Sequence, residues 1–239
     1  DTWSDGTASY LAMITPRLIL MRELLADTGS IYVHLDWHVG HYVKLVLDDV
    51  FGKDNFTNEI IWKRSEAHSD ASAFGAVHDV IFFYRKTRNN IWNRQYTPYT
   101  SDYIERQFKY VEKESRRRYR SADLSASGLS GGGYTYEWNG ITRSWRCPIQ
   151  TMERYKSEGR LDYTGKGLVR YKYYLDEMPG LAIQSVWTDI GKIHHLADER
   201  ISYQTQKPEE LLERIIRSSS NDDALVADFN GGRSEEHTS

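Results

Sequence analysis

The chain has 239 residues, of which 39% are apolar and 27% charged, enough to bury the core of one large domain or two small ones. Charged side chains interrupt its apolar segments, so we expect no spanning helix, and its polar, acidic start does not resemble a signal peptide. A single cysteine, Cys147, excludes an intrachain disulfide framework and a cysteine metal cluster, and fits a reducing cytoplasm. We therefore expect a cytoplasmic protein with no membrane partner.

The net charge of -3 hides an uneven distribution along the chain. Residues 88–174 contain 17 Lys and Arg against 9 Asp and Glu, so this segment carries +8 and the remainder -11. The same segment holds 16 of the 31 aromatic residues. Positive charge combined with exposed aromatic rings suits a nucleic-acid surface. The alternative is a Tyr-rich β-subdomain whose Lys and Arg are merely solvated, and composition leaves both open.

The first 87 residues have the pattern of an α/β fold. Five segments predict regular structure, namely helices at 8–27 and 39–51 and strands at 30–36, 59–63 and 78–84. The last of these strands is apolar almost throughout, as expected when both faces of a sheet are covered. The alternation of helix and strand predicts part of a doubly wound fold.

Two polar residues, His34 and Asp36, lie at the carboxyl end of the first predicted strand. Ligand-binding groups of α/β sheets lie at such ends. Asp36 is more simply explained as the N-cap of the following helix. Neither His68 nor His78 has carboxylate or cysteine partners at metal-ligand spacing, so no metal site is predicted.

After Lys86 the pattern changes to that of a mostly β insertion, with borders near residues 88 and 180. A helical period occurs only at 101–119, and the glycine run at 131–133 marks a flexible turn. Short aromatic segments predict strands at 134–138, 143–146, 159–163 and 168–175.

Four arginines near the end of the predicted 101–119 helix form the strongest local candidate for DNA contact: Arg116, Arg117, Arg118 and Arg120. Their guanidinium groups would contact successive phosphates of the DNA backbone and make binding sensitive to salt. Such contacts position a duplex and do not read its bases. The alternative is a solvated, charged helix end.

The last part of the chain returns to an α/β pattern. Residues 208–220 predict a helix whose Leu211, Leu212, Ile215 and Ile216 face inward. The apolar run 224–228 predicts a strand that rejoins the first sheet. We therefore expect one domain interrupted by an insertion.

A strand that ends in an acid and a glycine turn, Asp228-Phe-Asn-Gly-Gly232, is how Rossmann-like sheets begin a nucleotide-type cofactor site. Glycines at such a turn let the backbone approach a ligand closely. Gln206-Lys207-Pro208 lies some twenty residues upstream. The motif comes unusually late, since a first cofactor strand normally opens its domain.

This order of motifs resembles the beta-class DNA amino-methyltransferases, which include the modification subunits of type III restriction systems. The likeness extends over residues 1–232 and depends on order and spacing. The segments that carry it are Ser30-Ile-Tyr-Val-His-Leu-Asp36, Trp62-Lys-Arg-Ser65, His78-Asp-Val-Ile-Phe-Phe-Tyr84, Val186-Trp-Thr-Asp-Ile190 and Thr205-Gln-Lys-Pro208.

The resemblance implies an incomplete Rossmann-like S-adenosylmethionine methyltransferase sheet with a mostly β target-recognition insertion. Residues 1–87 would be the catalytic half of the core, 88–180 the insertion, and 181–232 the return to the core with the start of the cofactor site. Residues 233–239 look like the translation of a sequencing adapter, the alternative being a genuine acidic tail.

The resemblance also implies transfer of a methyl group from S-adenosylmethionine to the exocyclic N6 of an adenine flipped out of double-stranded DNA. The positions matching the cofactor motifs are Lys207, Pro208, Asp228, Phe229, Gly231 and Gly232. A restriction subunit or a second copy of the chain would be a further partner.

The sequence departs from the family in lacking the amine-binding motif, an acid or serine followed by two prolines and an aromatic residue, because it contains no Pro-Pro pair. We therefore assign no catalytic residue and expect a fragment, truncated before Asp1 and inactive by itself. Phe229 and Asn230 also differ from the Pro and Phe usual in the glycine motif.

Two alternatives stay open. A cytosine-N4 methyltransferase differs from an adenine enzyme chiefly in the absent motif. A non-catalytic nucleic-acid-binding module would use only the basic, aromatic middle of the chain. A nicotinamide-dependent oxidoreductase is disfavoured, because its glycine turn should lie near the start of the domain.

Overall fold

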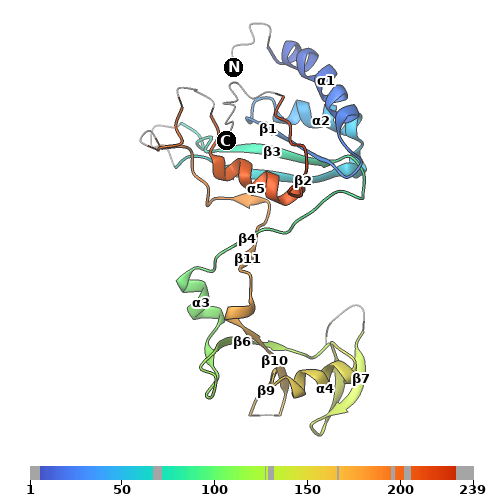
Figure 1. Cartoon of the computed structure of the whole chain (residues 1–239), viewed down its shortest axis with the longest axis vertical. Helices are drawn as coiled ribbons and strands as arrows, with labels where there is room; N and C mark the ends of the chain where they lie inside the picture. Colours follow the sequence, from blue (N-terminus) through green and yellow to red (C-terminus); the bar gives the residue numbers. More distant parts are fainter. Residues whose placement is uncertain are drawn as a thin grey trace. The chain divides into compact units, whose positions relative to one another are not determined.

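The computed structural model describes residues 6–66, 72–126, 128, 132–165, 167–194, 197–201 and 206–229. The chain forms two compact units (Figure 1). Unit 1 contains the chain up to Gln95 and from Ala182 onward, and unit 2 is Tyr96–Leu181. These borders differ from the expected 88 and 180 because Asn93 and Gln95 still hydrogen-bond to a helix of unit 1.

Unit 1 is built around a four-stranded sheet. Its helices are α1 (Gly6–Leu24), α2 (Gly40–Phe51), η1 (Lys53–Asn55) and α5 (Glu209–Ser219), and its strands are β1 (Ser30–Leu35), β2 (Phe56–Lys63), β3 (His78–Arg85) and β12 (Val186–Trp187). The strand order is β1-β3-β2-β12, with β3 antiparallel to both neighbours and β12 parallel to β2. The elements expected before residue 85 are confirmed, in a mixed sheet.

Strand β3 contributes side chains to both faces of this sheet. Val80, Phe82 and Tyr84 pack with α1 and α2, whereas Ile81 and Phe83 pack with α5. The alternation follows from the two-residue period of a strand. All five side chains are at most 8% exposed, which confirms the prediction of a strand covered on both faces.

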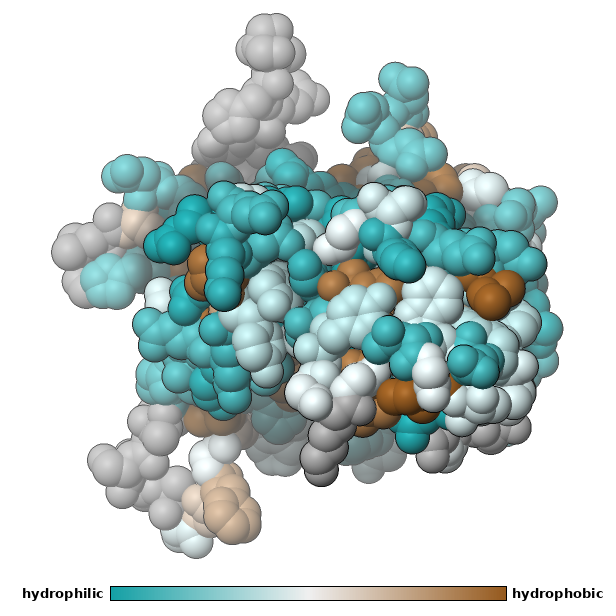
Figure 2. Space-filling model, turned by 90° about the horizontal axis from the view of Figure 1, so that it is seen from below, coloured by the Kyte–Doolittle hydropathy of each residue, from teal (hydrophilic) through white to brown (hydrophobic). Residues whose placement is uncertain are grey.

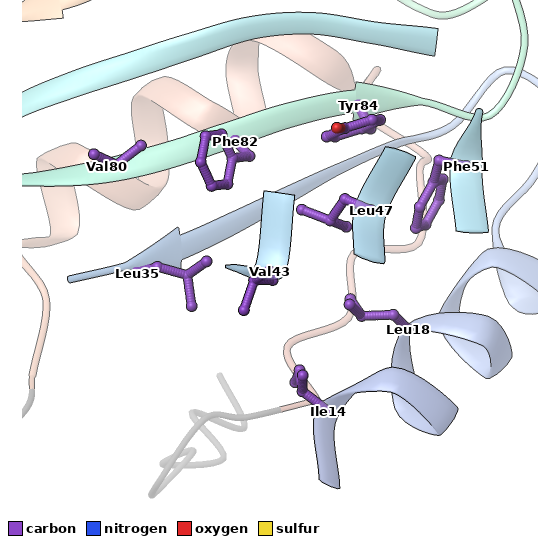
Figure 3. Close-up of a cluster of buried hydrophobic side chains, with 9 residues drawn as sticks. All are labelled: Ile14, Leu18, Leu35, Val43, Leu47, Phe51, Val80, Phe82 and Tyr84. Atoms are coloured by element: carbon purple, nitrogen blue, oxygen red, sulfur yellow. The ribbon is translucent and has the colours of Figure 1, made fainter. Parts of the chain in front are cut away.

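The first core lies between the sheet and the two N-terminal helices (Figure 3). Buried side chains recur every four residues and so share one face of each helix. They are Val43, Leu47 and Phe51 on α2, and Ile14 and Leu18 on α1. Truncating such a residue to alanine typically costs about 2 to 5 kcal/mol, because a cavity is left behind.

The second core packs α5 against the opposite face. Leu211 is 1% exposed and Ile215 is partly buried, but Leu212 and Ile216 are 44% and 41% exposed. The expectation that all four face inward is therefore wrong for Leu212 and Ile216. The four residues form two pairs of neighbours along the helix, and successive residues of a helix point about 100° apart. The four side chains therefore cover a wider part of the helix surface than the part that faces the sheet.

A charged residue completes the inward stripe of α5. Arg214 is 8% exposed and makes two hydrogen bonds to Asp189, at 3.0 and 2.6 Å. Its guanidinium carbon lies 5.1 Å from the ring centre of Trp187. These contacts compensate the burial of the charge. The hydroxyl group of Ser218 donates a hydrogen bond to the Arg214 carbonyl and is thereby also satisfied.

The segment 224–228 forms no strand in the described structure, so the prediction that it rejoins the sheet is wrong. Leu225 is 98% and Val226 53% exposed. An extended segment becomes a strand only where a neighbouring strand pairs with its backbone groups. None of the ladders among the described residues includes this segment.

Unit 2 consists of small sheets and three short helical segments. Its elements are β4 (Tyr96–Thr97), α3 (Ser101–Gln107), β5 (Tyr110–Val111), β6 (Arg118–Asp123), β7 (Tyr134–Trp138), β8 (Ile141–Trp145), α4 (Ile149–Ser157), β9 (Leu161–Tyr163), β10 (Val169–Tyr174) and η2 (Leu175–Glu177). The strand β11 (Leu181–Ala182) includes the border between the two units. The sheets are β5-β6-β10-β9, β7-β8 and β11-β4.

The predicted β insertion is thus present, with two differences. The helix expected over 101–119 ends at Gln107, where Phe108 leaves helical geometry and becomes fully buried. Tyr119 then alternates with exposed and half-exposed arginines, which suits a strand with one covered face. The helix α4 at 149–157 was not expected, and its Met152 enters the core of unit 2.

The core of unit 2 combines residues from α4 and from several strands or strand ends: Leu124, Trp145, Cys147, Met152, Leu161 and Val169. Burial raises the pKa of the Cys147 thiol. Among the described helices of both units, none has the length and apolar character needed to cross a membrane.

Candidate functional site

Three side chains from different strands or strand ends meet at one end of the unit 1 sheet. Because β3 is antiparallel to β1 and β2, its first residues lie beside their last ones. His34 comes from β1, Asp79 from β3, and Arg64 directly follows β2. His34 Nε2 lies 3.0 Å from Asp79 Oδ2, and Arg64 Nε lies 2.9 Å from Asp79 Oδ1. Each carboxylate oxygen therefore has its own partner.

The carboxylate is the most buried member of this cluster. Asp79 is 7% exposed, whereas the side chains of His34 and Arg64 are 19% and 42% exposed. Arg64 Nε is shielded from solvent, and its contact with Asp79 lacks hydrogen-bond geometry, so the two form an ion pair. The His34 ring also packs edge-on against Trp62, with 5.4 Å between ring centres.

The electrostatic surroundings keep Asp79 ionised. Burial by itself would raise the pKa of this carboxyl. The hydrogen bond with His34 and the charges of His34, Arg64 and Lys207 outweigh burial, so the pKa of Asp79 lies below its ordinary value. Leu211, in the first turn of α5, packs in the same core as Trp62 near the end of β2, so the start of α5 lies toward this end of the sheet.

Lys207 lies in a segment that is tied to the start of α5. The Gln206 amide donates a hydrogen bond to the Glu199 carbonyl. The Glu199 carboxylate in turn accepts the backbone N–H of Glu209 at 2.9 Å. The first N–H groups of a helix lack partners within it, so an acid placed there stabilises the helix. The predicted helix start at Pro208 is confirmed.

Asp36 hydrogen-bonds to the turn that precedes α2. Its Oδ1 accepts hydrogen bonds from the backbone N–H groups of His38 and Val39, at 3.0 and 3.4 Å. The helix begins at the next residue, Gly40, with Val39 in the cap position. The side chain therefore organises the turn before the helix, close to the capping role that the sequence favoured.

The structure describes four of the six residues predicted to bind the cofactor. Lys207 and Pro208 lie at the start of α5, Asp228 and Phe229 lie on an exposed segment, and Gly231 and Gly232 lie outside the described residues. Phe229 is 55% exposed. The described part of this segment therefore does not form the predicted strand, and the glycines of the predicted turn lie outside the described residues.

The four arginines predicted to contact DNA belong to a strand and the turn before it. The expected helix end is wrong, because β5, a turn and β6 occupy residues 110–123. Arg116 is exposed, with a backbone φ of 60°, and Arg118 is exposed at the start of β6. These two side chains are available to a ligand.

The other two arginines make contacts inside unit 2. Arg117 donates two hydrogen bonds to Asp176, at 2.9 and 2.8 Å, and lies 3.8 Å above the Tyr174 ring. Arg120 lies 4.6 Å from the centre of the Tyr173 ring. The predicted group of four therefore divides into two exposed and two internally bound arginines.

Exposed tyrosines add aromatic surface to unit 2. Tyr110, Tyr134 and Tyr163 are 49%, 53% and 44% exposed. On the face of the molecule in Figure 2, hydrophilic and intermediate residues predominate, and hydrophobic residues occur in small separate areas. Such a surface offers ring faces and charges, without a large apolar patch on that face.

Sequence reasoning did not select Arg64 and Asp79 as site residues. Their signal was present, since each is a charged residue at the end of an apolar strand segment. His34 was selected on that ground, at the end of β1. The pairing of β3 with both neighbours, which the sequence alone did not give, brings the three together.

Comparison with known proteins gives a family match along nearly the whole chain. The family described as DNA methylase matches residues 3–234. The Type II methyltransferase M.EcaI of Enterobacter cloacae is 29% identical over 236 residues, which cover 96% of this chain and 52% of that protein.

Two further relatives are subunits of restriction systems. The Type III restriction-modification enzyme StyLTI Mod subunit of Salmonella typhimurium strain LT2 is 30% identical over 243 residues, covering 94% of this chain and 37% of that protein. The EcoP15I Mod subunit of Escherichia coli is 22% identical, covering 96% of this chain and 43% of that protein. The chain thus spans between 37% and 52% of the length of these relatives. Its match along nearly all its residues shows that the chain belongs to the DNA methylase family.

Proposed function

We propose that this chain is part of an enzyme that transfers a methyl group from S-adenosylmethionine to the exocyclic N6 of adenine in double-stranded DNA. The observation that carries the proposal is the family match over residues 3–234. The relatives named as Mod subunits of restriction-modification enzymes support a restriction subunit as a partner. A second copy of the chain is the other partner that the resemblance implies.

Unit 1 is proposed to be half of a Rossmann-like methyltransferase sheet. The mixed sheet has helices on both faces, which supports this assignment. Strand β1 pairs with β3 on one side, and its residues are half-buried or buried. An edge strand with little exposed side-chain surface is suited to receive a further strand.

Unit 2 is proposed to be the target-recognition region. Its net positive charge, its exposed tyrosines and the exposed Arg116 and Arg118 support contact with a phosphate backbone. Stacking of bases on tyrosine rings would add affinity at any unpaired base.

The cofactor fits the described residues only in part. Lys207, Pro208, Asp228, Phe229, Gly231 and Gly232 are the residues proposed to hold it. Phe229 offers an exposed ring, but the described segment before it forms no strand. Bound S-adenosylmethionine would supply an electrophilic methyl group. The amine that receives it needs hydrogen-bond acceptors to align its lone pair.

The amine-binding motif is absent from this sequence, so we propose that the 239-residue chain alone does not transfer methyl groups. Purified chain, incubated with duplex DNA and S-adenosylmethionine labelled in its methyl group, should leave the DNA unlabelled. Labelled DNA would overturn this statement.

The cofactor assignment is tested by photochemical cross-linking of labelled S-adenosylmethionine to the complete gene product that contains this chain. We expect a cross-link that an excess of unlabelled cofactor suppresses. A complete product that forms no such cross-link, yet binds DNA in a salt-dependent manner, would instead be a non-catalytic binding module.

A further inference from the structure

The cluster around Asp79 contains more positive charge than its carboxylate balances. Arg64 and Lys207 both act on this one buried acid. The neighbouring acids have other partners, since Glu66 pairs with Lys63 and the Glu199 carboxylate caps α5. Within the described residues, Asp79 is thus the acid that these two cations share.

Arg64 is held beside Asp79 at its Nε, while its side chain stays partly exposed. Its Nε is shielded from solvent beside Asp79, while the side chain as a whole is 42% exposed. A guanidinium has five N–H donors in a fixed plane, and the Nε contact leaves its terminal nitrogens for a second ligand. Because Asp79 already restricts Arg64, binding a ligand costs less side-chain entropy.

The backbone fixes the position of Arg64 as well. Its N–H donates to the Val77 carbonyl at 3.0 Å, and its carbonyl accepts the N–H of Lys192 at 3.1 Å. The residue thus lies between the segment that enters β3 and the segment that follows β12. The carboxyl ends of β1 and β2 lie here, the end at which α/β sheets bind ligands.

We propose that Arg64 and Lys207, anchored by Asp79, form a binding site for an oxyanion. The proposal rests on the proposed function, which supplies two sources: a phosphodiester of the bound DNA, or the carboxylate of S-adenosylmethionine. Both present oxygen pairs that a guanidinium binds with two parallel hydrogen bonds. Asp79 is a positioning residue, and Arg64 and Lys207 contact the anion.

The test uses a double variant, Arg64→Gln with Asp79→Asn, of the complete gene product. It removes the ion pair without changing the net charge, so any loss of binding reflects the local site. The matched control is Arg88→Gln with Asp54→Asn, which removes an exposed pair of unit 1 whose atoms lie 3.8 Å apart.

Two binding measurements distinguish the sources of the anion. If DNA supplies it, the slope of log binding constant against log salt concentration falls in magnitude by about 1 in the Arg64/Asp79 variant and stays unchanged in the control. If the cofactor supplies it, the dissociation constant for S-adenosylmethionine rises by about tenfold or more in that variant only. Wild-type values for both quantities would overturn the proposal.

Circular dichroism establishes that the variants are folded. Should the double variant not fold, Lys207→Gln takes its place, with the same two readouts and the same expected losses. Methyl transfer by the wild-type product is measured in parallel. If it is absent, the proposed function fails, whereas methyl transfer combined with unchanged anion binding in the variants overturns only the oxyanion site.

Discussion

At the scale of single residues, adjacent arginines of unit 2 differ in what surrounds them. Arg116 and Arg118 are exposed, whereas Arg117 is bonded to Asp176 and Glu177. A cation bound to two acids offers less to a phosphate than an exposed cation does. The four arginines, which look equivalent in the sequence, should therefore separate into a DNA-contacting and a structural pair.

This separation predicts different outcomes for two substitutions. Arg116→Gln with Arg118→Gln should reduce the magnitude of the salt slope of duplex binding by about 2, because two phosphate contacts are lost. Arg117→Gln should leave the slope unchanged and lower the urea midpoint for unfolding. The salt slope is measured by fluorescence anisotropy with a labelled duplex. Equal slopes for the wild type and the Arg116/Arg118 variant would contradict the assignment.

Glu112 should make the stability of unit 2 depend on acid pH. Hydrogen bonds from Lys172, Ser115 and Tyr174 lower the pKa of Glu112 from 4.5 to about 2. A carboxyl with a lowered pKa stabilises the fold at pH values above its unfolded pKa, and this contribution is lost as the pH falls through the folded value. The stabilisation should therefore be complete above about pH 4.5 and disappear toward pH 2.

The measurement is the urea midpoint between pH 6 and pH 2. In the Glu112→Gln variant, the urea midpoint should fall less steeply below pH 4.5 than in the wild type. The control is Glu153→Gln, at an exposed position of α4, and its midpoint should follow the wild type. A wild-type pH dependence in the Glu112 variant would show that its ion pair does not stabilise the fold.

At the scale of elements, α5 shows which face of a helix packs on the sheet. Leu211→Ala should cost about 2 to 4 kcal/mol, because the side chain is 1% exposed and leaves a cavity. Leu212→Ala removes the same atoms from a side chain that is 44% exposed, so its cost should stay below about 1 kcal/mol. Urea unfolding gives both values, and equal losses would contradict the packing of α5.

Elements with a clear local period could be predicted from the sequence. The strands β3 and β7 and the helices α1, α2 and α5 lie where the sequence placed them, give or take a few residues. Apolar residues recur at every second position in the strands and at every third or fourth position in the helices. The same spacing puts these residues on the face that packs against the core. The expected helix over 101–119 was wrong beyond Gln107, because the charged residues that follow fit either period.

Contacts between distant residues could not be predicted in this way. Tyr32 and Ser219 are hydrogen-bonded at 2.6 Å although 187 positions separate them. Asp79 likewise meets His34, 45 positions earlier in the chain. Such pairs depend on which strands are neighbours in the sheet. The sequence of a strand shows which of its side chains share a face, but it does not show which strand pairs with it. The sequence therefore indicated that candidate site residues lie at the ends of strands, but not which of these residues are in contact.

At the scale of the whole molecule, the chain combines an interrupted α/β unit with a basic insertion. Residues up to Gln95 and from Ala182 onward build one sheet with its two cores, and the 86-residue segment between them folds as unit 2. The family match runs through both units. This continuity shows that both units belong to the sequence that the DNA methylase family shares.

The most direct test of this account is the identity of the base that the complete gene product modifies. The purified product is incubated with DNA and S-adenosylmethionine carrying a deuterated methyl group, and the nucleosides are separated and weighed by mass spectrometry. The account predicts deuterated N6-methyladenine. Deuterated N4-methylcytosine would contradict the adenine assignment, and DNA without deuterated bases would contradict the proposed methyl transfer itself.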